Sequence, residues 1–191
     1  MAGAQKGMKS PTIDEEKKIT VPIDTTTEPA KAATDTILRT VADENNCIQL
    51  PVRVGQIAND LGLRIRLEDM DWKLEGYLTR DNAGDPIDIV MNRDKPVVRR
   101  RFTMAHEIGH YIRKYQDVKD PFNGPHRDKK AAAGFDSDEI WANGFAASLL
   151  MPASIVRKYW AEGKSLKEMA SIFGVSETAM DIRRANLGLV G

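Results

Sequence analysis

Apolar residues in the first half of the chain recur every three or four positions, starting just after residue 28. That interval brings them onto one face of a helix, and it predicts helices over residues 29–46 and 51–62. Each segment opens on a proline, and Gly62 is a typical helix stop. We therefore expect the folded part of the chain to begin with two helices.

The spacing of apolar residues then changes to two. Such alternation is typical of strands with one buried face, and it predicts three of them, at residues 63–67, 74–79 and 87–91. The turn-forming residues at 81–85 join the second strand to the third. We therefore expect an α+β fold with a small, largely antiparallel three-stranded sheet.

Helical spacing returns in the second half of the chain. One helix is predicted around residues 102–110 and another from Asp138 to the helix breaker Pro152. Between them, residues 116–137 have no periodicity and predict a long loop, either disordered or covering a site.

The C-terminal segment resembles a helix-turn-helix. Residues 165–168 form a capping box, Gly174 suits a tight turn, and Ser176 can cap a last helix through Ala185. That last helix sets Glu177 and Asp181 against Arg183 and Arg184, whereas DNA-reading helices are normally more basic. We expect it to pack or to bind a protein partner, with DNA contact as the weaker alternative.

Composition limits the possible partners and compartment. The chain has 191 residues, 41% of them hydrophobic, which is enough for one good core. Lysine plus arginine equals aspartate plus glutamate at 28 each, so the chain has no general attraction to nucleic acid or an anionic membrane. A local basic stretch at residues 93–101 is either a binding patch or, as we favour, the solvated start of a helix.

The cysteine content and hydropathy indicate a cytoplasmic protein. Cys47 is the one cysteine, which excludes an internal disulfide and a multi-cysteine zinc site. We expect it to be a small core residue. No apolar run approaches the ~18 residues that span a membrane, and no signal peptide is evident.

The chemistry of the chain centres on a His-Glu-x-x-His motif. His106 and His110 lie four residues apart, so a helix brings both imidazoles to one face, where they can bind one Zn²⁺. Glu107 lies beside them and can act as general base on a zinc-activated water. Only three histidines occur in the chain, which makes this spacing less easily accidental. Gly109 lowers helix stability and indicates a close backbone approach.

Glu139 is our predicted third metal ligand. It shares a helix face with the small Ala142 and with Asn143, as expected if this helix packs tightly across the histidine-bearing one. Asn143 could then hydrogen-bond the free nitrogen of a liganding histidine. Two alternatives stay open. Glu139 could form a capping box with Asp136 and have no role beyond starting the helix, or His126 in the long loop could be the third ligand.

With these pieces in place, the chain resembles the ImmA/IrrE family of metallo-endopeptidases, from about Thr36 to the C-terminus. The resemblance depends on three stretches, which are Arg101-Phe102-Thr103-Met104-Ala105-His106-Glu107-Ile108-Gly109-His110, Glu139-Ile140-Trp141-Ala142-Asn143-Gly144-Phe145-Ala146 followed by Leu149-Leu150-Met151-Pro152, and Phe173-Gly174-Val175-Ser176. It implies zincin-type helices with His106, His110 and Glu139 as ligands and Glu107 as base. It also implies cleavage of a transcriptional repressor, and in some relatives a toxin and antitoxin pairing.

We therefore expect a zinc-dependent endopeptidase that cleaves a helix-turn-helix repressor or antitoxin. Its predicted parts are a disordered tail over 1–28, a zinc metallopeptidase domain over 29–152, and the helix-turn-helix-like segment over 153–191 packed on that domain. The alternative is a regulatory protein that binds a repressor, an antitoxin or DNA through the C-terminal segment. Tyr111, Tyr115 and His126 are the candidate oxyanion donors, and the sequence does not choose among them.

Overall fold

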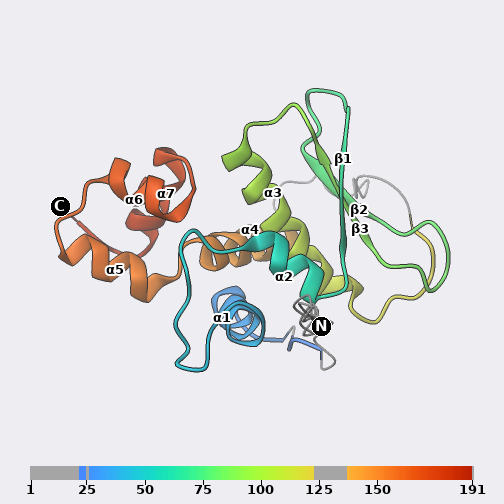
Figure 1. The fold of residues 1–191 in the computed structure, drawn as a ribbon, viewed down its shortest axis with the longest axis horizontal. Coiled ribbons are helices and arrows are strands. Elements are labelled where there is room, and N and C mark those ends of the chain that lie inside the picture. The colour runs from blue at the N-terminus through green and yellow to red at the C-terminus, as the bar shows by residue number, and fades with distance from the viewer. Residues whose placement is uncertain (1–21, 25, 123–136, 191) are drawn as a thin grey trace, which may run out of the picture.

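The computed structural model describes residues 22–24, 26–122 and 137–190, and within them the fold is α+β, as predicted (Figure 1). Seven α-helices, one π-helical turn and three strands lie in these ranges. In chain order they are α1 (Pro29–Thr40), α2 (Val54–Asp60), β1 (Arg64–Glu68), β2 (Gly76–Thr79), β3 (Asp88–Asn92), α3 (Val97–His110), the π-helical η1 (Tyr111–Tyr115), α4 (Ser137–Leu150), α5 (Ala153–Ala161), α6 (Leu166–Phe173) and α7 (Glu177–Asn186).

The sheet has the predicted three strands, but it is mixed rather than largely antiparallel. Its order is β1-β3-β2, with β3 parallel to β1 and antiparallel to β2. The chain does reverse direction from each strand to the next, as the short connections require. The third strand is inserted between the first two, so it runs alongside β1 in the same direction. β2 is left at an edge of the sheet.

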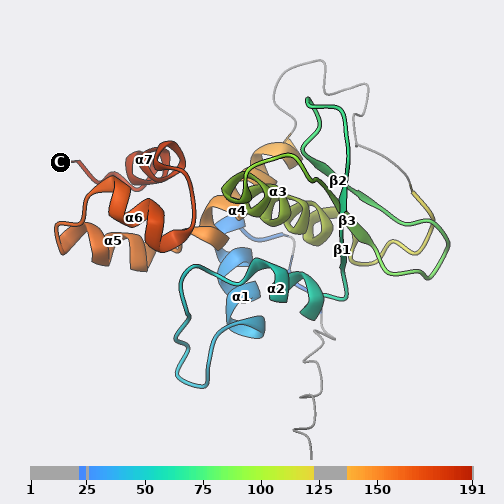
Figure 2. The same cartoon turned by 45° about the horizontal axis from the view of Figure 1, so that its top comes forward.

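Helices α3 and α4 pack directly on each other at the centre of the molecule. The sheet lies at one end of this pair and the C-terminal helices α5 to α7 lie at the other (Figures 1 and 2). A Cβ on Gly109 would lie 3.2 Å from the Ala142 Cα and 3.2 Å from the Phe145 ring. Glycine and alanine therefore allow the two helix backbones to come closer than larger side chains would permit.

The first helix is shorter than the spacing of apolar residues suggested. It ends at Thr40 rather than near residue 46. The Asp43 carboxylate accepts hydrogen bonds from the backbone N–H groups of Asn45 and Cys47, at 2.9 and 2.8 Å, and this local turn replaces helical bonding. Cys47 is exposed, so the expectation of a core cysteine is wrong.

Packing begins before the predicted end of the N-terminal tail. Residues 1–21 and 25 lie outside the described residues, but Ile23 is only 2% exposed and belongs to the hydrophobic core. The Gln116 side chain exchanges two hydrogen bonds with the Ile23 backbone, at 2.7 and 2.9 Å, and the Trp141 indole donates to the Thr27 carbonyl. The boundary at residue 28 is therefore placed too late.

The C-terminal helices are tied to the central pair by arginine side chains. Arg101 of α3 donates to the carbonyl of Gly174, between α6 and α7, and to that of Val52. Arg183 of α7 donates to the Met151 carbonyl at the end of α4. The predicted capping box at Ser165 and Glu168 is formed, and Gly174 adopts the left-handed conformation of a helix C-cap. No helix among the described residues is long and apolar enough to cross a membrane.

Candidate metal centre

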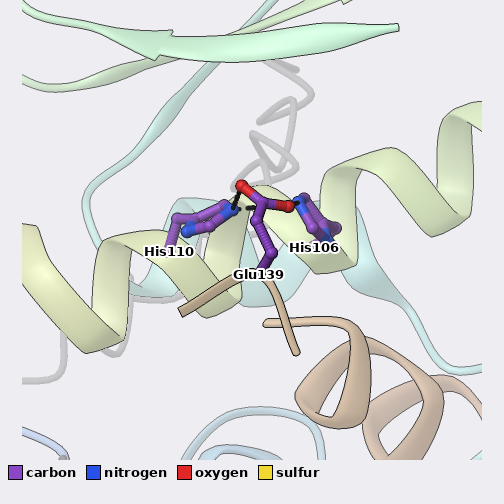
Figure 3. Close-up of side chains that lie close together, drawn as sticks. All are labelled: His106, His110 and Glu139. Carbon is purple, nitrogen blue, oxygen red and sulfur yellow. Dashed lines mark hydrogen bonds and ion pairs between the residues drawn. The ribbon is translucent and has the colours of Figure 1, made fainter. Parts of the chain in front are cut away.

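His106 and His110 occupy adjacent turns of α3 and face the same side of it (Figure 3). Their Nε2 atoms are 2.9 Å apart, and the two rings meet edge to face. Two nitrogen lone pairs repel each other at this distance unless a hydrogen or a cation lies between them. The helix therefore presents a pair of convergent imidazole nitrogens, as the four-residue spacing predicted.

Glu139 reaches the same point from the first turn of α4 (Figure 3). Its carboxylate oxygens lie 3.3 Å from the His106 Nε2 and 3.1 Å from the His110 Nε2. Ligands of a tetrahedral zinc stand ~2.0–2.1 Å from the ion, and therefore roughly 3.3 Å from each other. The two nitrogens and the carboxylate thus form a donor set that fits one zinc ion. The alternatives with Asp136 and His126 fall on residues outside the described part of the chain.

Asn143, one turn after Glu139 on α4, contacts the other ring nitrogen of His106. Its Oδ1 lies 3.1 Å from the Nδ1 of His106. A carbonyl oxygen only accepts, so this bond requires the ring hydrogen on Nδ1 and leaves Nε2 with a free lone pair. Asn143 therefore favours the His106 tautomer whose Nε2 would be free to bind a metal.

Burial controls the protonation of two groups of the motif, His106 and Glu107. It lowers the pKa of His106, although Glu139 and the hydrogen bond to Asn143 act in the opposite direction, so the neutral imidazole is favoured. It also raises the pKa of Glu107 to about 8, with the charge of Glu139 adding to the effect. Glu107 is 8% exposed and sits on the buried side of α3. A divalent cation beside it would favour its ionised form.

The three predicted ligands lie in a cavity of about 290 Å³ between α3, α4 and β2. Its other walls were not predicted: Glu75, just before β2, accepts hydrogen bonds from Thr103 and Arg99 of α3. A Cβ on Gly76 would lie 2.7 Å from the Thr103 side chain, so glycine is what lets the strand approach the helix. A glycine within a strand pattern was the one available signal of that approach.

The two tyrosines considered as oxyanion donors lie outside the lining of the metal cavity. Tyr111 and Tyr115 belong to η1, and neither lines the metal cavity in the part of the chain that the structure describes. Tyr115 stacks on Phe122 instead. The third candidate, His126, lies outside the described residues.

Comparison with known proteins identifies the family. Residues 58–184, about two thirds of the chain, match the peptidase M78 family, described as the IrrE N-terminal-like domain. The radiation response metalloprotease IrrE of Deinococcus radiodurans is 32% identical over 129 residues, which cover 62% of this chain and 35% of that protein. The chain thus spans about a third of that relative. Because this family match covers more than half of the chain, the chain belongs to the IrrE N-terminal-like peptidase family, as its motifs indicated.

Proposed function

We propose that this member of the family is a zinc-dependent endopeptidase. The observation that carries the proposal is the convergence of His106, His110 and Glu139 within hydrogen-bonding distance of one another, with Asn143 fixing one ring. Two histidines and one carboxylate leave a coordination position for water, which is the pattern of catalytic rather than structural zinc sites. When bound, zinc polarises the substrate carbonyl and activates water.

Glu107 is the general base in this proposal. It follows His106 directly, and its carboxyl is buried. Besides burial, the cause of its raised pKa is the charge of Glu139. A carboxylate in such surroundings accepts a proton readily, so Glu107 takes the proton of the attacking water and returns it to the leaving amine. Glu107 lines the metal cavity together with His106 and His110.

The edge of β2 is suited to holding the backbone of an extended substrate. Arg80 exchanges hydrogen bonds of 2.8 and 3.0 Å with Phe122, whereas the Glu75 carbonyl accepts from Asn92 of β3. Backbone groups alternate along a strand, so those of Gly76 and Leu78 point to the same outer side as those of Arg80. An extended peptide pairing there would lie along the wall of the metal cavity.

The substrate we propose is a helix-turn-helix transcriptional repressor or antitoxin, acted on in the cytoplasm. This choice is supported by the family resemblance, and the relative's own name links it to a radiation response. The alternative, binding to DNA through the C-terminal helices, is disfavoured by the contacts of two arginines. Arg183 donates to the Met151 carbonyl, and Arg184 pairs with Asp181 and packs over Trp160, so both are engaged within the protein.

The test uses the purified zinc-loaded chain and the helix-turn-helix repressor encoded beside its gene. Wild type should cut the repressor, whereas Glu107→Gln should bind zinc and the repressor equally well and cut ~10²–10⁴ times more slowly, because it cannot accept the proton. Cleavage is followed by mass spectrometry and zinc by elemental analysis. A Glu107→Gln protein that keeps its zinc and cuts at the wild-type rate would sink the mechanism.

A further inference from the structure

A second hollow of about 680 Å³ opens beside the metal cavity, between the N-terminal end of α3, the outer side of α4 and α7. We call it the apolar groove. Its walls include large apolar side chains that stay accessible: Val98 of α3 is 39% exposed, Ile140 of α4 55% and Ile182 of α7 57%. Accessible apolar side chains gathered around one hollow are typical of a surface that binds another molecule.

The groove is suited to polypeptide rather than to nucleic acid. It has two cationic lining residues, Arg99 and Arg183, and both are already engaged, Arg99 with Glu75 and Arg183 with the Met151 carbonyl. The other lining groups of α7 are small or uncharged, among them Thr178 and Ala179. No phosphate backbone would find free charge on these walls, whereas apolar side chains would be desolvated there.

The groove is continuous with the metal cavity. Arg99, Phe102 and Asn143 line both hollows, and Phe102 lies one helical turn before His106. Along α3, the distance from His106 to Phe102 is about 6 Å and to Val98 about 12 Å at ~1.5 Å per residue. An extended peptide advances ~3.3 Å per residue, so these distances correspond to about two and four of its residues.

We propose that the apolar groove binds large apolar side chains of the polypeptide substrate, two to four residues to one side of the scissile bond. This inference rests on the proposed endopeptidase function and adds a specificity to it. The substrate it selects is a flexible or unfolding segment that carries leucine-like residues at that distance from the cleaved bond.

The experiment uses zinc-loaded full chain and quenched fluorescent decapeptides of glycine, alanine and serine, with one leucine moved through all positions. Mass spectrometry of the products should locate the cut two to four residues from the leucine. The variants Ile182→Ser and Val98→Ser should raise KM for these peptides about tenfold or more, since each removes most of one apolar contact, and should raise KM for leucine-free peptides far less. A cut that ignores the leucine would overturn the proposal.

Val97→Ser is the matched control. Val97 is 62% exposed, neighbours Val98 on α3 and does not line the groove, so its variant should behave as wild type. Equal effects of Val97→Ser and Val98→Ser would count against the groove. Self-association that Ile182→Ser abolishes in sedimentation velocity would show that a second copy occupies it, and would overturn the proposal too.

Binding of the leucine decapeptides to Glu107→Gln, measured by fluorescence anisotropy, separates the two proposals. If wild type cuts no peptide but Glu107→Gln binds leucine peptides in a manner sensitive to Ile182→Ser, the proposed function fails and the groove remains a peptide site. If wild type cuts peptides and neither cutting nor binding depends on leucine or on Ile182, the endopeptidase stands and the groove inference fails.

Discussion

The metal cavity and the apolar groove share a wall but differ in almost everything else. The first is the smaller, and its lining holds two histidines and several other ionisable groups, with Glu107 and Glu139 among them. The second is more than twice as large and is lined mainly by apolar and small side chains, contributed in part by the C-terminal helices. The residues of the metal cavity and those of the apolar groove can therefore be altered separately.

Glu139→Ala should produce the largest difference between the two hollows. Loss of a histidine's hydrogen-bond partner already costs ~10–100-fold in metal affinity, so loss of a direct ligand should cost more than about 100-fold and abolish cleavage. Zinc affinity by competition with a chelator measures the effect. Peptide binding in the groove should be unchanged.

The neighbouring Asp138 provides the control. It pairs with Arg113 and Lys114, away from the histidine nitrogens, so Asp138→Ala should keep its zinc. Should Glu139→Ala retain zinc as firmly as Asp138→Ala, Glu139 is no ligand.

Asn143→Ala should act next most strongly, on the shared wall. Without its carbonyl, nothing described fixes the His106 hydrogen on Nδ1, so zinc affinity should fall by about 10–100-fold. Asn143→Asp offers an acceptor in the same place and should restore most of that affinity. If alanine and aspartate behave alike, the side chain does not orient His106.

Gly109→Ala should have the smallest effect, and it should fall on the packing of α3 against α4. The new Cβ would meet the Ala142 Cα at 3.2 Å and its carbonyl oxygen at 3.3 Å, and backbone atoms cannot move aside without moving α4. Overpacking of ~1–3 kcal/mol, partly offset by ~1 kcal/mol of helix propensity, predicts a net loss of up to about 2 kcal/mol in the free energy of unfolding. Urea unfolding measures it.

Gly55→Ala is the matched comparison in another helix. There the new Cβ would have only an ordinary contact, 3.8 Å from Ile65, so helix propensity should stabilise the protein by up to about 1 kcal/mol. Equal shifts for the two variants would mean that the α3 to α4 approach is not tight.

The parts of the centre that the sequence predicted depend on local geometry. The spacing of His106 and His110 fixes their common face on any α-helix, and Gly109 with Ala142 indicated the close approach that brings Glu139 across. Asn143 followed from the turn it shares with Glu139. Each of these inferences needed only the helical repeat and one pair of helices in contact.

What the sequence could not predict depends on tertiary placement. Nothing in the strand pattern says that β3 enters between β1 and β2, because strand order is decided by contacts distant in the chain. Ile23 was assigned to a disordered tail because its surroundings are polar, yet one side chain suffices to fill a place in the core. The sequence also could not show that the Arg183 side chain donates a hydrogen bond to the Met151 carbonyl, 32 residues away in the chain.

The α3 to α4 pair also limits how the length of this chain can vary. Glu139 and Asn143 act on the same histidine from successive turns of α4, and Ala142 between them contacts Gly109. One residue inserted between Glu139 and Asn143 would rotate one against the other by about 100°, the angle between successive residues of an α-helix. Natural variants can therefore exchange side chains along these helices far more easily than they can gain or lose a codon within them.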